Sequence, residues 1–112
     1  MKFPKLVDPR FTQTPLHITL YAEGITEDGA PVTALDGDFL GNWQDGAKTI
    51  LTKEQKKVQI SGRAYLDGDI APQLAEITGG AVTVFGAARQ IVKGQKHRNP
   101  DGSVNFTELD VV

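Results

Sequence analysis

Residues 89–111 read RQIVKGQKHRNPDGSVNFTELDV, and this stretch decides the fold class. At its centre, residues 99–102 spell Asn-Pro-Asp-Gly, in which the proline fixes φ and the glycine completes a chain reversal. The flanking segments 89–97 and 103–111 are therefore predicted to form a β-hairpin. In its second strand we expect Val104 and Phe106, and then Leu109 and Val111, to face inward, with a bulge where the parity changes.

The same turn chemistry recurs along the chain. Asp-Gly pairs supply a residue that enters the left-handed region at little cost, and they begin at Asp28, Asp36, Asp45, Asp67 and Asp101. Gly79-Gly80 adds another turn. Between these points, apolar residues alternate with polar ones over 16–21 and 58–66, as they do in half-buried strands. Residues 82–92 predict one long strand bent at Gly86, or two strands.

Five to seven short strands joined by such turns predict an all-β fold, a small antiparallel β-barrel or sandwich with long loops. At most one short helix is expected, and residues 72–77 are its candidate because Pro72 occupies the first helical position and Gly79 lies just past the end. Residues 44–57 are interpreted as a mobile loop. An extended, basic N-terminal arm, residues 1–15, precedes a single domain of residues 16–112.

Composition agrees with one globular domain: the chain has 112 residues, of which 39% are hydrophobic and 23% charged. The absence of cysteine excludes disulfides, zinc knuckles and thiol nucleophiles. No run of apolar residues is long enough to span a membrane, and residues 1–14 lack the apolar stretch of a signal peptide. We therefore expect neither a membrane-spanning protein nor a secreted one.

Catalytic combinations are missing from the sequence. Its only serines, Ser61 and Ser103, stand in no nucleophile motif, and His17 and His97 fit structural or interface roles. Two Asp-Gly-Asp triplets, at 36–38 and 67–69, suit turns better than metal binding, although a hydrolase that uses their carboxylates stays a third alternative. We therefore expect no enzyme, no cofactor, no metal site and no small-molecule substrate.

Charge is unevenly distributed along the chain. Residues 23–45 contain acids and no base, whereas 48–63 and 89–98 are mostly basic. Either neighbouring strands neutralise each other within one subunit, or the acidic flank of one subunit meets the basic flank of the next. Trp43 is interpreted as a core residue, with an interface anchor as the alternative. The candidate partner-binding residues are Trp43, Lys48, Lys53, Lys56, Lys57, Arg89, Lys93, Lys96, His97 and Arg98.

Four short sequence segments, in their order along the chain, resemble those of a known protein family. LHITLY (16–21) is followed by GRAYLDGDI (62–70), ITGGAVTVFG (77–86) and KHRNPDGSVN (96–105). Over 16–112 this resembles the head-closure, or head–tail connector, proteins of long-tailed phages and prophages, also labelled head–tail joining or minor capsid proteins.

The resemblance implies a compact β-barrel-like subunit whose copies form a ring under the portal and adaptor, retain packaged DNA and dock the tail. Such a protein belongs to the virion and is assembled in the cytoplasm of the bacterial host. Residues 44–57 would be the stopper or inter-subunit loop, and the 96–103 hairpin a ring or docking contact.

The alternative is a small β-barrel module, unrelated to virions, that binds nucleic acid or protein. In that case the cationic side chains of 93–98 would follow phosphates, and Tyr21, Tyr65 or Phe106 would stack on bases.

Overall fold

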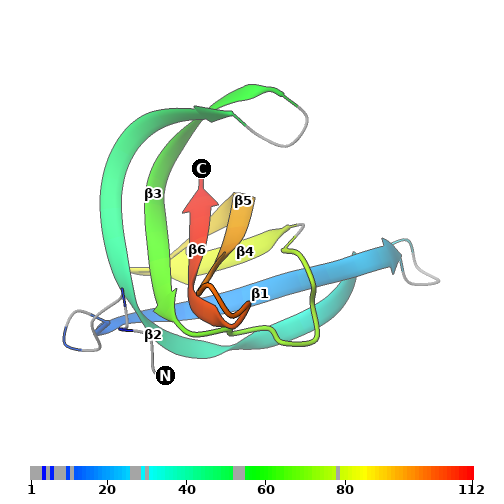
Figure 1. The fold of residues 1–112 in the computed structure, drawn as a ribbon. Coiled ribbons are helices and arrows are strands. Elements are labelled where there is room, and N and C mark those ends of the chain that lie inside the picture. The colour runs from blue at the N-terminus through cyan, green and yellow to red at the C-terminus, as the bar shows by residue number, and fades with distance from the viewer. Residues whose placement is uncertain are drawn as a thin grey trace.

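The computed structural model describes residues 4, 6, 10, 12–25, 29, 31–51, 55–77 and 79–112. Its strands are β1 Thr14–Ile25, β2 Pro31–Leu51, β3 Lys57–Asp67, β4 Gly80–Val84, β5 Ala87–Arg98 and β6 Val104–Val111. All neighbouring strands are antiparallel and pair in the order β1-β2-β3-β6-β5-β4, with β4 returning to β1 (Figure 1). The prediction of an antiparallel all-β fold is confirmed. The closed ring of strands departs from a regular barrel because the long β2 arches with β3 over one side of it.

The interior follows the predicted alternation. In β1, Leu16, Ile18 and Leu20 are buried while His17 is exposed, and β3 buries every second residue from Ile60 to Leu66. Except for Ile60 and Gly62, these buried residues pack in one apolar core with residues of β4, β5 and β6, namely Val82, Val84, Ile91, Leu109 and Val111. Burial of this shared surface is the main stabilising term that keeps the ring of strands closed.

The observed course of strand β2 contradicts three predictions. The expected turns at Asp36-Gly37 and Asp45-Gly46 and the expected loop at 44–57 are wrong, because β2 is continuous through both pairs and reaches Leu51. Gly37 lies opposite Ile18 in the β1–β2 ladder, and Asp45-Gly46 falls at a register shift, where a bulge bends the strand. Of the predicted loop, residues 52–54, including Lys53, lie outside the described residues.

The C-terminal hairpin is confirmed, but its inward face is not the predicted one. The inward side chains of β6 are Asn105, Thr107, Leu109 and Val111, with no change of parity. Polar residues are tolerated inside because each has partners: the Thr107 hydroxyl donates to the Gly68 carbonyl, and the Asn105 amide group donates to the Pro4 carbonyl and accepts from the Leu6 N–H. The expected inward positions of Val104 and Phe106 are therefore wrong.

The β4–β5 connection is a tight turn, whereas the β3–β4 connection is long. Residues 82–92 form two strands, β4 and β5, joined by a turn at Phe85-Gly86. Residues 72–77 form turns and bends instead of a helix, with one hydrogen bond from the Leu74 N–H to the Ala71 carbonyl. Among the described residues, no helix is long and apolar enough to cross a membrane.

Two pairs of strands continue past the closed ring as arms (Figure 1). Strand β4 pairs with β1 only over residues 17–20, so the ends of β1 and β2, residues 21–25 and 31–35, continue as a two-stranded segment that we call the first arm. Likewise β6 pairs with β3 only over residues 62–67, so 48–51 and 57–60 form the second, or basic, arm. The first arm extends sideways and the basic arm arches over β6.

Candidate interaction surfaces

The outer face of β1 and β2 carries an exposed cluster that we call the acidic face: His17, Asp36 and Asp38. The Nδ1 atom of His17 lies 2.8 Å from a carboxylate oxygen of Asp38, and its Nε2 atom lies 2.6 Å from one of Asp36. Thr19 donates a further hydrogen bond to Asp36. The ladder explains the grouping, because His17 is paired with Asp38 and Thr19 with Asp36 on adjacent strands.

Two carboxylates around one imidazole favour its charged form. Carboxylates only accept hydrogen bonds, so the ring satisfies both when both of its nitrogens are protonated. The hydrogen bond to Asp38, and then that to Asp36, raise the pKa of His17 above its ordinary value. With His17 charged, the cluster retains a net negative charge. Among the described residues, neither aspartate pairs with a lysine or arginine.

The basic arm carries exposed cations, opposite in charge to the acidic face. Lys48, Lys56 and Lys57 are exposed there, and Leu51 lies directly opposite Lys57 in the β2–β3 ladder. Leu51 is 48% exposed, although Ile50 beside it is buried. The outward face of the arm is therefore a mixed apolar and cationic surface.

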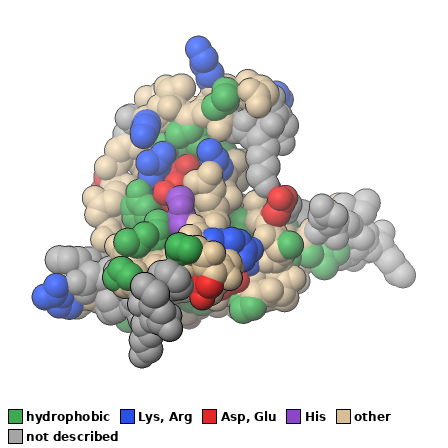
Figure 2. Space-filling model, viewed as in Figure 1, with side chains coloured by type: hydrophobic (Ala, Val, Ile, Leu, Met, Phe, Trp, Pro, Cys, Tyr) green, Lys and Arg blue, Asp and Glu red, His purple; other side chains and the backbone are tan. Residues whose placement is uncertain are grey.

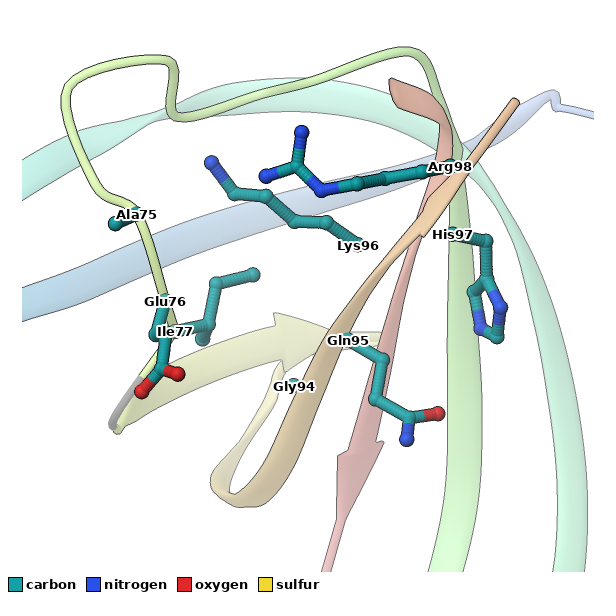
Figure 3. A pocket seen from close by; sticks show the side chains of 8 residues that line it. All are labelled: Ala75, Glu76, Ile77, Gly94, Gln95, Lys96, His97 and Arg98. Atoms are coloured by element: carbon teal, nitrogen blue, oxygen red, sulfur yellow. The ribbon is translucent and has the colours of Figure 1, made fainter. Parts of the chain in front are cut away.

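Lys96, a predicted partner-binding residue, is instead a buried clamp. Its side chain is 5% exposed and its Nζ lies 2.9 Å from a carboxylate oxygen of Asp69. The ammonium group also donates to the carbonyls of Ala71, at 2.8 Å, and Leu74. Figure 3 shows the side chain reaching from β5 toward the β3–β4 connection, whereas Gln95 and His97 point to the other side of the strand. Three acceptors use all three donors of the ammonium group.

A hollow of about 290 Å³ adjoins this clamp, between the β3–β4 connection and β5 (Figure 3). Glu76, Ile77, Gly94 and Arg98 are among the residues that line it. Gly94 is required here, because a Cβ atom at this position would lie 2.5 Å from the Ile77 side chain. The Lys96 ammonium group, which borders the hollow, is already bound within the protein and is not available to a ligand.

Charged side chains gather on the outer sides of β3, β5 and β6 beneath the basic arm; we call Arg63, His97, Glu108 and Asp110 the charged cluster. Figure 2 shows acidic, basic and histidine side chains together in this hollowed region. The Nε atom of Arg63 lies 2.8 Å from a carboxylate oxygen of Asp110, in an ion pair that is not aligned as a hydrogen bond. Burial, together with the nearby Glu108 carboxylate, raises the pKa of Asp110.

The aromatic side chains of this region are already stacked on protein groups. The rings of His97 and Phe106 are parallel with centroids 4.3 Å apart, and Tyr65 lies 6.2 Å from Phe106. His97 is also 3.5 Å from the Glu108 carboxylate. A base-stacking platform needs an open ring face beside cations, and here one face is covered and carboxylates adjoin it. The geometry therefore gives no support to the nucleic-acid alternative at this place.

Trp43 lies in the core, as its favoured interpretation predicts. It is 9% exposed, its indole N–H donates to Asp45 at 2.8 Å, and Gly62 leaves room for its ring. The Arg89 guanidinium lies over the ring, 5.5 Å from its centroid, and donates to Ser61. Both residues therefore act within the subunit.

The candidate residues thus divide into two groups. Arg89, Lys96, His97 and Arg98 bind groups of the same chain, the last through the Gly102 carbonyl, but among the described residues none of the acids that they bind lies in the acidic stretch 23–45. Lys93 lies partly buried on β5, whereas Lys48, Lys56 and Lys57 are exposed on the basic arm.

Sequence reasoning missed Phe85, a large apolar side chain that is 75% exposed at a hairpin tip. The pair Phe85-Gly86 between two β-rich segments was the available signal.

Comparison with known proteins gives no family. No protein-family model matches the chain, and a search of curated proteins finds no match. Among the described residues, no group of three or more potential ligands is arranged to hold a metal ion.

Proposed function

We propose that the protein is a structural assembly component, a head-closure or head–tail connector of a long-tailed phage or prophage. Its copies would form a ring under the portal and adaptor, retain packaged DNA and present a docking surface to the tail. It acts through assembly, without turnover. The sequence resemblance motivates this assignment, and one structural observation carries it: an exposed acidic face and an exposed basic arm belong to one closed β-ring.

A ring requires two different surfaces on each subunit, because head-to-tail contacts join unlike patches and close after a fixed number of copies. The first arm belongs to the acidic stretch of the sequence, which includes Glu23, Glu27 and Asp28, and the acidic face lies on the same two strands. The basic arm supplies exposed lysines. Among the described residues, Asp36 and Asp38 pair with no lysine or arginine, and Lys48 and Lys57 are exposed on the basic arm. This arrangement favours contact between subunits over neutralisation within one.

The closed ring of strands also suits a connector. Strand edges are paired within the closed ring, so unpaired edges lie where strands extend past it, as in the two arms, and association with another chain is favoured there.

The test is assembly with the components that the proposal names. The purified chain is mixed with the portal–adaptor complex and tails encoded by neighbouring reading frames, and particles are inspected by electron microscopy. A ring added beneath the adaptor, and tails joined only when the chain is present, are the expected results. Absence of binding to both, or neighbouring genes without portal and tail components, contradicts the proposal.

Ionic strength gives a second readout. Contacts between exposed charges weaken when salt shortens the screening length below its physiological value of about 8 Å. Ring occupancy should therefore fall at high salt, and occupancy that is unchanged argues against charge-guided contacts.

A further inference from the structure

Phe85 occupies an unfavourable conformation and leaves its ring in solvent. Its φ is 51° and that of Gly86 is 78°, so both central residues of the β4–β5 turn are left-handed. Two-residue hairpin turns of this kind prefer Asn-Gly, because asparagine tolerates positive φ and phenylalanine does not. The side chain is nevertheless 75% exposed. Neither local conformation nor burial in the isolated chain accounts for phenylalanine at this position, which suggests a role in binding.

The ring borders a hollow with one apolar and one acidic wall. The hollow measures about 370 Å³ and is lined by Pro15, Leu16, His17, Asp38, Thr83, Phe85 and Gly86. Leu40, which is 62% exposed, pairs with Pro15 across β1 and β2 and extends the apolar wall. His17 and Asp38 are the next outward pair along the same ladder, so an anionic group lies directly beside the apolar wall.

The basic arm carries the complementary pattern. Leu51 and Lys57 face each other in the β2–β3 ladder, so an exposed apolar side chain lies beside an exposed cation. Residues of the arm are not among those that line the hollow of the same chain. A second copy can therefore supply an apolar group for Phe85 and a further cation beside Asp38, which binds His17 within a cluster that keeps a net negative charge.

We propose that the basic arm of one copy docks in this hollow of a second copy, with Leu51 against Phe85 and Lys57 beside Asp38. The contact joins two different surfaces, so each subunit has one arm to give and one hollow to fill, as a ring of identical subunits requires. The inference rests on the proposed function, because it names the interface that would build the ring.

Disulfide trapping tests the contact directly, since the chain has no cysteine of its own. Leu51→Cys and Phe85→Cys are mixed under mild oxidation at the highest soluble concentration. We expect a mixed disulfide dimer, and only a background amount when Leu51→Cys is mixed with Gln90→Cys, at an exposed site on β5. A mixed dimer no more abundant than this control, or equally efficient dimers of Phe85→Cys alone, overturns the proposal.

Phe85→Asn supplies a variant that should fold well. Asparagine suits the left-handed turn, so the midpoint of thermal unfolding should be unchanged or higher. Self-association, measured by sedimentation or by ring occupancy on the portal–adaptor complex, should weaken about tenfold or more because an apolar anchor is lost. Association that is unaffected by Phe85→Asn and Asp38→Asn overturns the interface.

The two proposals fail in different ways. Rings that form on the portal–adaptor complex without Leu51–Phe85 trapping leave the connector function intact and reject this interface. Trapping without binding to portal or tail leaves the interface intact and rejects the connector.

Discussion

Replacing Lys96 by methionine should strongly destabilise the fold. The substitution removes the ammonium group and leaves three acceptors, the Asp69 carboxylate and the carbonyls of Ala71 and Leu74, without their common donor. Breaking a buried ion pair on one side costs about 3–5 kcal/mol, and the lower end applies because Asp69 retains 24% of its exposure. The free energy of unfolding should therefore fall by about 3 kcal/mol.

Urea denaturation followed by tryptophan fluorescence measures this change, since Trp43 lies in the core. With a slope of about 2 kcal/mol per molar urea, the midpoint should move down by about 1.5 M. Gln95→Met on the exposed neighbouring position is the matched control, and its midpoint should change little, equivalent to about 0.5 kcal/mol at most. Equal midpoints for the two variants would refute the clamp.

Lys96→Arg should also destabilise the protein, because a planar guanidinium cannot direct its donors at three acceptors grouped around one point. Asp69→Asn should cost less than Lys96→Met, since the lysine keeps its two carbonyl partners. The reverse order would mean that the carboxylate, and not the cation, organises this connection.

Further predictions concern pH and packing. The raised pKa of His17 means that its contribution to stability is complete below about 6.5 and is lost as pH rises through the folded-state pKa; His17→Gln should flatten thermal midpoints across that window. The raised pKa of Asp110 predicts that its stability contribution falls as pH rises from about 3.9 through the folded-state value, which NMR titration of the carboxyl should locate above 3.8. Gly94→Ala should lower stability by about 1–3 kcal/mol because Ile77 lies 2.5 Å from the new Cβ, whereas Gly46→Ala, with nothing within 4 Å, should change it little in urea unfolding.

The fold class followed from local sequence signals, since turn residues and alternation act over a few positions. Gly68 and Gly102 do adopt positive φ at strand ends, at 72° and 92°. Asp36-Gly37 carries the same local signal but lies inside β2, because its register with β1 places Gly37 opposite Ile18. Register depends on the apolar pattern of both paired strands, so the residues around Asp36-Gly37 alone do not reveal it.

The inward face of β6 and the roles of the site residues could not be predicted from the sequence for a similar reason. Phe106 lies outside because His97, on the next strand, provides a stacking partner, and Thr107 lies inside because the Gly68 carbonyl accepts a hydrogen bond from its hydroxyl. Lys96 appears in the sequence as one of several cations, and only the folded β3–β4 connection turns it into an internal clamp. Polar or apolar character predicts which residues are buried, except where a polar residue finds a specific hydrogen-bond partner in the interior.

The strand order has a consequence for biosynthesis. Strand β6, the last of the six along the chain, lies between β3 and β5, so it separates segments that leave the ribosome before it. The cylinder of strands therefore cannot close cotranslationally until β6 has emerged, and its apolar interior stays open to other nascent chains until then. Pairing between segments so distant in sequence is slow, which makes this interval the period of greatest risk of misassembly.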